Sequence, residues 1–220
     1  MTAPRERGGS AATQTPETLR RAKRQPKARP DLVVIGCSLG GMHALEKVLS
    51  GLPSDFPLPI AVVQHRHKAS NEGLPAYLRK HSKLPVVDVE DKQWIRPGTV
   101  YLAPADYHLL VEKGEFNLSV DDAVRFSRPS IDVLFESAAD AYRGGVIAVV
   151  LTGANEDGAR GAETVKRRGG IVIVQNPGEA EAPAMPQATI DNVQVDRILR
   201  LDEIAAYLVE LSRAQPSVMR

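Results

Sequence analysis

The chain has 220 residues, of which 43% are hydrophobic and 25% charged, as in an ordinary globular domain. Its 28 Lys and Arg against 27 Asp and Glu leave a net charge of +1, which gives no electrostatic sign of a nucleic-acid partner. The single cysteine, Cys37, excludes an internal disulfide framework. No apolar run approaches the roughly 20 residues of a membrane span, and no signal-peptide core is present, so we expect a cytoplasmic protein without membrane insertion.

The charge is uneven along the chain. Residues 1–30 hold eight basic and two acidic residues, a net charge of +6 that leaves −5 for the remainder. This segment has almost no large aliphatic side chains, so it cannot bury enough apolar area to offset the entropy lost on ordering. We therefore predict a disordered basic tail over 1–30, an α/β catalytic domain over 31–212, and a short tail over 213–220.

The first predicted unit is a strand, a glycine turn and a helix. The apolar run 32–35 ends at Gly36, and a Gly-x-Ser-x-Gly-Gly turn follows. Beyond it, apolar residues recur at helical spacing, namely Met42, Leu45, Val48 and Leu49. Such a turn raises Ser38 to the carboxyl edge of a sheet, beside the free N–H groups of a helix N-terminus. The same glycines could instead serve only close packing of the strand and helix.

Strands and helices then alternate. We predict strands at 60–63, 86–89, 99–103, 146–151 and 171–174, and a hairpin formed by 108–111 and 116–120. Helices are predicted at 74–79, at 129–142 with Pro129 in the first turn, from about 158 to 168, as a short helix near 185, and at 201–211. This order predicts a doubly wound, mostly parallel α/β sheet with helices on both faces and an inserted antiparallel hairpin.

Three polar residues follow the ends of predicted parallel strands. Ser38 follows the first, His65 the second, and Asp157 the strand at 146–151. Because ligands bind at the carboxyl edge of such a sheet, these groups could form a nucleophile, base and orienting acid, with Gln64 and Thr152 adding hydrogen bonds. Each also has a structural alternative: Ser38 and Asp157 could cap their own helices, and His65 could be a solvated loop histidine.

Two common templates fit poorly. A dinucleotide-binding fingerprint requires a glycine where this chain has Ser38, and an acidic residue where it has Gln64 and His65. The α/β-hydrolase elbow requires the order Ser, acid, His, with several strands before the serine, whereas Ser38 follows the first strand and the order here is Ser, His, Asp.

From residue 32 to about 211 the chain resembles the catalytic domain of the chemotaxis protein-glutamate methylesterases, the CheB family. Six blocks in family order carry the resemblance: IGCSLGG (35–41), VVQHRH (62–67), YLAPADYHLLV (101–111), RPSIDVLFESAA (128–139), LTGANEDGARG (151–161) and AMPQATI (184–190). Matched position by position, the resemblance places the nucleophile at Ser38, the base at His65 and the acid at Asp157.

The resemblance implies a serine esterase that hydrolyses glutamyl methyl esters on cytoplasmic chemoreceptor helices, or on another methylated signalling protein, and that deamidates particular receptor glutamines. It implies neither a metal nor an organic cofactor, and the His65-x-His67 pair is interpreted as incidental. No receiver domain precedes the catalytic region, so we expect no control by aspartyl phosphorylation in cis and a separate regulatory protein instead.

The chain departs from the family pattern near the predicted pocket. Leu39 stands where the family commonly has Thr, Ala154 and Asn155 replace Met and Gly, and Ala184 replaces Gly. These changes leave the three catalytic positions intact but are expected to reshape the pocket lip. Two alternatives therefore stay open: a catalytically weak binding or regulatory module with the same fold, and a nucleotide-binding domain.

Overall fold

A computed structural model describes residues 30–66 and 73–213 of the chain. The predicted basic tail up to residue 29, the predicted C-terminal tail from residue 214, and His67 lie outside the described residues. Within the described part, none of the helices combines the length and apolarity needed to cross a membrane.

The centre of the fold is a parallel sheet of seven strands in the order β3-β4-β2-β1-β7-β8-β9. The strands are β1 (Leu32–Cys37), β2 (Ile60–Gln64), β3 (Val86–Asp88), β4 (Val100–Leu102), β7 (Val146–Val150), β8 (Ile171–Gln175) and β9 (Arg197–Leu199). The strands β1, β7 and β8 are buried along their whole length, as expected when helices cover both faces. The predicted parallel α/β class is confirmed.

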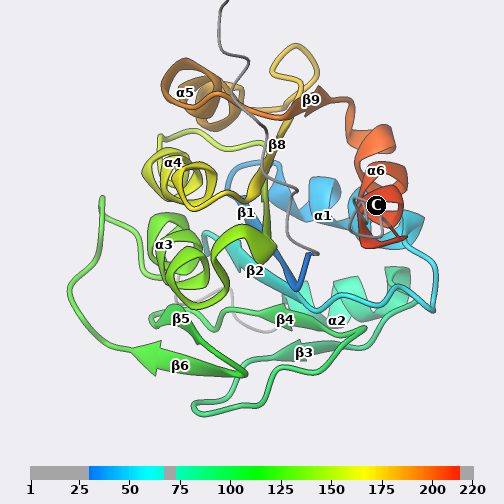
Figure 1. The fold of residues 1–220 in the computed structure, drawn as a ribbon, viewed down its shortest axis with the longest axis vertical. Helices are drawn as coiled ribbons and strands as arrows, with labels where there is room; N and C mark the ends of the chain where they lie inside the picture. The colour runs from blue at the N-terminus through cyan, green and yellow to red at the C-terminus, as the bar shows by residue number, and fades with distance from the viewer. Residues whose placement is uncertain (1–29, 67–72, 214–220) are drawn as a thin grey trace, which may run out of the picture.

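Among the described residues, α-helices cover both faces of the sheet in two groups (Figure 1). One side carries α1 (Gly41–Gly51), α2 (Gly73–His81) and α6 (Leu201–Arg213), and the other carries α3 (Ile131–Tyr142), α4 (Ala159–Arg167) and α5 (Ala184–Asn192). A short 3₁₀ turn, Arg143–Gly145, leads from α3 into β7. Alternate side chains of β1 enter the two hydrophobic clusters, Val33 and Ile35 on the α1 side and Leu32 and Val34 on the α3 side.

The predicted hairpin is present as β5 (His108–Glu112) and β6 (Glu115–Ser119), paired antiparallel. It packs beside α3, where Ser137 Oγ accepts a hydrogen bond from the Val111 N–H at 3.1 Å. Its apolar face joins the α3-side cluster, with the Phe116 ring 4.8 Å from that of Tyr101. The hairpin therefore completes the hydrophobic cluster on the α3 side of the sheet.

Three local features differ from the predictions. Pro129 lies outside α3, and the helix is N-capped by Ser130. Met42 is 49% exposed, because the buried stripe of α1 runs through Gly41, Ala44, Leu45, Val48 and Leu49 instead. The strand β9 was not predicted because it has no apolar run in the sequence and is a mostly exposed edge strand. It is aligned by Asp196, whose carboxylate accepts hydrogen bonds from Lys166 Nζ and the Val172 N–H.

The order of the strands in the sheet brings the three candidate residues to one edge. Strand β1 lies between β2 and β7, so the chain leaves β1 in one direction and later returns to its other side. The carboxyl ends of these three strands are therefore neighbours, and ligands of doubly wound sheets bind at such a switch point. Ser38, His65 and Asp157 all lie just beyond these ends.

Candidate active site

Ser38 lies in a tight turn whose backbone is hydrogen-bonded on both sides. Its N–H donates to the Thr152 carbonyl at 2.9 Å, and its carbonyl accepts from the Gly41 N–H at 2.9 Å and from Gln64 Nε2 at 2.8 Å. The turn passes through Gly40, which has φ +78°, a left-handed conformation that glycine adopts without strain. These bonds fix Ser38 between the ends of β2 and β7.

Gly41 allows the turn to approach β2 closely. A Cβ at this position would lie 2.1 Å from Gln64 Oε1 and 2.9 Å from Cys37 Sγ. Gln64 also accepts a hydrogen bond from the Cys37 thiol at 3.0 Å. The side-chain amide of Gln64, the residue that precedes His65, therefore connects the Ser38 turn to the end of β2, and Gln64 supplies hydrogen bonds at this site as predicted.

Thr152, which follows β7, also holds the Ser38 turn in place through hydrogen bonds. Its hydroxyl donates to the Leu39 carbonyl at 2.9 Å and accepts from the Ala182 N–H at 2.8 Å. Its own N–H is held by Gln175 Oε1 at 2.8 Å. Gln175 was not anticipated from the sequence, where it reads only as the polar end of a buried strand.

His65 and Asp157 are in direct contact. His65 Nε2 lies 2.8 Å from Asp157 Oδ2, and the two side chains are 12% and 0% exposed. A carboxylate partner requires the proton on Nε2, which leaves the lone pair of Nδ1 free. Among the described residues Ser38 Oγ makes no direct hydrogen bond to His65, but both residues line one cavity of about 540 Å³. The structure thus brings all three predicted residues to one place.

Asp157 is held by the N-terminus of α3. Oδ1 accepts from Ser130 Oγ and the Asp132 N–H, both at 3.0 Å, and Oδ2 accepts from the Ile131 N–H at 2.7 Å in addition to His65. Burial by itself raises the pKa of Asp157, but the hydrogen bonds from His65 and the α3 amides outweigh it and hold the pKa below its usual range. The carboxylate therefore stays charged. It caps α3 rather than the helix that follows it, so the alternative of a cap for its own helix is wrong.

Asp132 forms the reciprocal arrangement. This residue of α3 has a fully buried carboxylate, whose Oδ1 accepts from the Gly158 and Gly161 N–H groups at 3.0 and 2.7 Å at the start of α4. Its Oδ2 has no hydrogen-bond partner among residues 30–66 and 73–213, and Arg125 and Arg160 approach it only to 3.7 Å. Burial raises the pKa of Asp132, in contrast to Asp157. Neither Ser130 nor Asp132 was identified as functional, although a Ser before an apolar helix is a capping signal.

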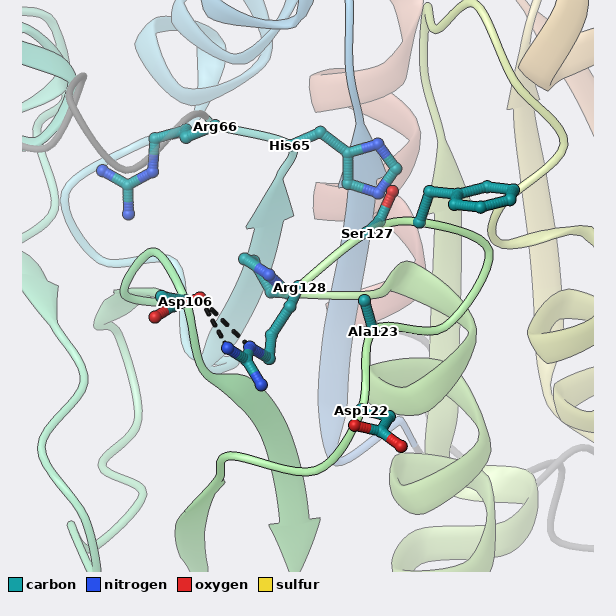
Figure 2. Close-up of a pocket in the computed structure, with 9 residues that line it drawn as sticks. His65, Arg66, Asp106, Asp122, Ala123, Ser127 and Arg128 are labelled. Carbon is teal, nitrogen blue, oxygen red and sulfur yellow. Dashed lines mark hydrogen bonds and ion pairs between the residues drawn. The ribbon is translucent and has the colours of Figure 1, made fainter.

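A second cavity, of about 640 Å³, is also lined by His65 (Figure 2). Its rim is the tight turn 124–127, closed by two hydrogen bonds between the Val124 and Ser127 backbones. The Phe126 side chain at the tip of this turn is fully exposed. Deeper in the cavity, Arg128 pairs with Asp106 at 2.8 Å. His65 therefore lines two cavities, one shared with Ser38 and one shared with Arg66 and Arg128.

Of the residues that depart from the family pattern, Leu39 lines a cavity of the site and Asn155 contacts Asp157. Leu39 lies beside Ser38 in the same cavity and is 56% exposed. Asn155 Oδ1 accepts a hydrogen bond from the Asp157 N–H at 3.2 Å, and the neighbouring Ala154 is exposed. Asn155 therefore stabilises the loop of the acid, whereas Leu39 presents an apolar surface to whatever approaches Ser38. No group of three or more His, Cys, Asp or Glu in the described ranges is arranged to hold a metal ion.

A family model described as CheB methylesterase matches residues 33–208. A protein of Leptospira interrogans (serogroup Icterohaemorrhagiae, serovar copenhageni) is 42% identical over 184 residues, which are 83% of this chain and 95% of the relative.

Longer relatives match over part of their length. The protein-glutamate methylesterase FrzG of Myxococcus xanthus is 37% identical over 90% of this chain and 59% of its own length. The protein-glutamate methylesterase/protein-glutamine glutaminase of Thermotoga maritima is 36% identical over 89% of this chain and 58% of its own. The crystal structure of the Thermotoga maritima CheB methylesterase catalytic domain superposes with a TM-score of 0.80 at 37% identity, covering 84% of this chain and all of that one.

Proposed function

The chain belongs to the CheB methylesterase family, and on this premise we propose that it hydrolyses glutamyl methyl esters of methylated chemoreceptors, or of another methylated signalling protein, and releases methanol. The observation that carries the proposal is the hydrogen bond between His65 and the buried, charged Asp157, with Ser38 in the same cavity as His65. The names of the relatives add a second reaction of the same site, deamidation of protein glutamines. Both reactions concern the cytoplasmic part of a receptor, so the proposal includes a cytoplasmic location for the enzyme.

The proposed reaction begins with acyl transfer to the serine. Ser38 Oγ attacks the ester carbonyl carbon while His65 Nδ1 accepts the hydroxyl proton. The charged Asp157 keeps the proton on Nε2 and stabilises the imidazolium that forms. The tetrahedral intermediate then collapses, the methoxy group takes the proton from His65, and methanol leaves. In the second half, water is deprotonated by His65 and attacks the glutamyl–Ser38 ester, which returns the proton to Ser38 and releases glutamate.

The oxyanion of this reaction requires N–H donors other than that of Ser38. The Ser38 N–H already donates to the Thr152 carbonyl. The N–H groups of Leu39 and Gly40, in the same turn, donate to no acceptor within the part of the chain that the structure describes. Loss of one oxyanion donor typically lowers kcat by about 10²–10³-fold, so the geometry of this turn is expected to control the rate.

The test is methanol release from a methylated receptor cytoplasmic fragment. Ser38→Ala, His65→Ala and Asp157→Asn should each lower kcat by several orders of magnitude, with removal of any member leaving only a small residual rate. A fluorophosphonate probe should label Ser38 in the folded wild-type protein and leave Ser38→Ala unlabelled. Wild-type-like turnover by Ser38→Ala would refute the mechanism, and an unlabelled, inactive wild type would favour a binding module.

A further inference from the structure

Arg66, the residue after His65, has a buried side chain with unused hydrogen-bond donors. The side chain is 6% exposed, and Nη2 donates to the Ala103 carbonyl at 2.5 Å. Within the part of the chain that the structure describes, Nε and Nη1 have no hydrogen-bond partner. The carboxylate of Asp88 lies 4.0 Å from Nη2, and it also lies 3.5 Å from Arg79. Arg66 is therefore a buried cation that the fold pairs only weakly.

A buried and weakly paired guanidinium lowers the stability of the folded state. Burial lowers the pKa of the Arg66 guanidinium, and the attraction of Asp88 offsets this only in part. A guanidinium nevertheless remains protonated in proteins, so the cost falls on the folded state as an incompletely compensated charge. A carboxylate that paired with the free donors would remove this cost, and charge-assisted bonds between Arg and carboxylates are among the strongest polar contacts in proteins.

The cavities that Arg66 lines indicate from which side a ligand carboxylate would approach its guanidinium. Arg66 lines the 640 Å³ cavity beside His65, and it also lines a hollow of about 450 Å³ with Met42, Leu74 and Tyr77. It does not line the cavity of Ser38. Figure 2 shows His65 and Arg66 leaving the end of β2 in opposite directions. A carboxylate at Arg66 is therefore a different group from the ester under attack at Ser38.

The other arginine of this cavity is already engaged. Arg128 donates to Asp106, at 2.8 Å from Nη2, and to the carbonyls of Val120 and Asp121 at 2.7 and 3.0 Å. Among the described residues that line the cavity, Arg66 is thus the cation with donors left for a ligand. Rotation of the guanidinium toward the cavity would expose these donors at the expense of one bond, to Ala103.

We propose that Arg66 binds the carboxylate of an acidic side chain that flanks the glutamyl ester on the substrate helix. The inference rests on the proposed function and adds to it a rule of substrate choice. Side chains three or four positions apart on a helix have Cβ atoms about 5–6 Å apart, and the Arg66 guanidinium, once rotated toward the cavity that it shares with His65, is the cation that an acid one turn from the ester would meet. The apolar hollow formed by Met42, Leu74 and Tyr77 would hold the aliphatic stems of the same helix.

The test uses two helical peptides, each with one glutamyl methyl ester. One carries Glu three and four residues on either side of the ester, and the other carries Gln at those positions. The measurement is the ratio of kcat/KM between the two peptides for the wild type, Arg66→Met, Arg66→Lys and Arg79→Met. Arg79 is the matched control, because it also faces Asp88 but lines none of these cavities.

Wild type and Arg79→Met should prefer the Glu-flanked peptide by about 10- to 100-fold, the range of a charge-assisted hydrogen bond, and the preference should reside in KM. Arg66→Met should abolish it, and Arg66→Lys should retain part of it. If Arg66→Met lowers kcat/KM equally for both peptides, the role of Arg66 is purely structural and the inference is wrong. If the wild type shows no preference between the peptides but still releases methanol, the inference is wrong and the proposed function stands. Failure of the wild type to release methanol from either peptide or from a methylated receptor would overturn the proposed function, and this inference with it.

Discussion

Asp157→Asn should impair both stability and catalysis, and the structure gives a magnitude for each. The carboxylate accepts four hydrogen bonds, two at each oxygen. An asparagine has one oxygen and one NH₂ group, so in either orientation its NH₂ faces a backbone N–H of Ile131 or Asp132. One buried donor left unsatisfied costs about 1–3 kcal/mol. Loss of the negative charge at the N-terminus of α3 costs up to about 2 kcal/mol more, so we expect a total of about 1–5 kcal/mol.

The catalytic effect depends on the tautomer of His65. If the NH₂ group of the substituted side chain points toward Nε2, this nitrogen must accept, and the proton moves to Nδ1, the atom that receives the Ser38 proton in the proposed mechanism. The analogous exchange in a serine protease triad lowers kcat by about 10⁴-fold. We expect a loss of about 10³–10⁴-fold in methanol release.

Asp132→Asn provides the matched control. Asp132 is as buried as Asp157 and also caps a helix, but the pKa of Asp132 is raised and it does not contact His65. An amide oxygen can keep both of its N–H partners, so unfolding in urea should show a change within about 1 kcal/mol. Methanol release should fall much less than in Asp157→Asn. Comparable losses in the two variants would refute the assignment of Asp157 as the residue that orients His65.

The lowered pKa of Asp157 also sets a pH dependence of stability. The unfolded chain binds a proton at this group near pH 3.8, whereas the folded chain binds it only at lower pH. Between these values the unfolded state holds more protons, so stability rises with pH there. The contribution is present above about pH 4 and is lost as the pH falls through the folded pKa. Urea midpoints from about pH 2.5 to 6 should show a steeper acid loss in the wild type than in Asp157→Asn, and parallel curves would contradict this.

Three further predictions concern the supports of the site. Gly41→Ala should displace the Gln64 side chain, because the new Cβ would lie 2.1 Å from Gln64 Oε1. We expect the unfolding free energy to fall by about 1–3 kcal/mol and methanol release to slow. Gly73→Ala is the control, because no described atom lies within 4 Å of its new Cβ, and it should show neither effect. Ser130→Ala removes a helix cap and one donor to the buried acid, so unfolding free energy should fall by about 1 kcal/mol and kcat severalfold; an unchanged kcat would show that this donor does not support catalysis. Burial raises the pKa of the Cys37 thiol, so iodoacetamide should neither modify the native protein nor inhibit it, and rapid inactivation would contradict this environment.

Local sequence signals were sufficient for most of the fold. The continuous apolar strands and the alternating helices predicted a parallel α/β sheet, because only strands buried on both faces are apolar throughout. The glycine turn predicted an exposed serine at a strand end, since its backbone geometry is encoded by adjacent residues. The edge strand β9 escaped prediction because its position depends on Asp196 and on pairing with β8, not on its own composition.

The sequence by itself therefore determined the class of fold and the positions of Ser38, His65 and Asp157 at three strand ends. Only the tertiary structure decided which of these groups contact one another and in what electrostatic environment. The strand order puts β1 between β2 and β7, and the Asp157 carboxylate is kept charged by the N-terminus of α3, about 26 residues earlier in the chain. The weak pairing of Arg66 is likewise visible only in three dimensions. Electrostatic environments of this kind arise from contacts between distant segments, and no local pattern of residues encodes them.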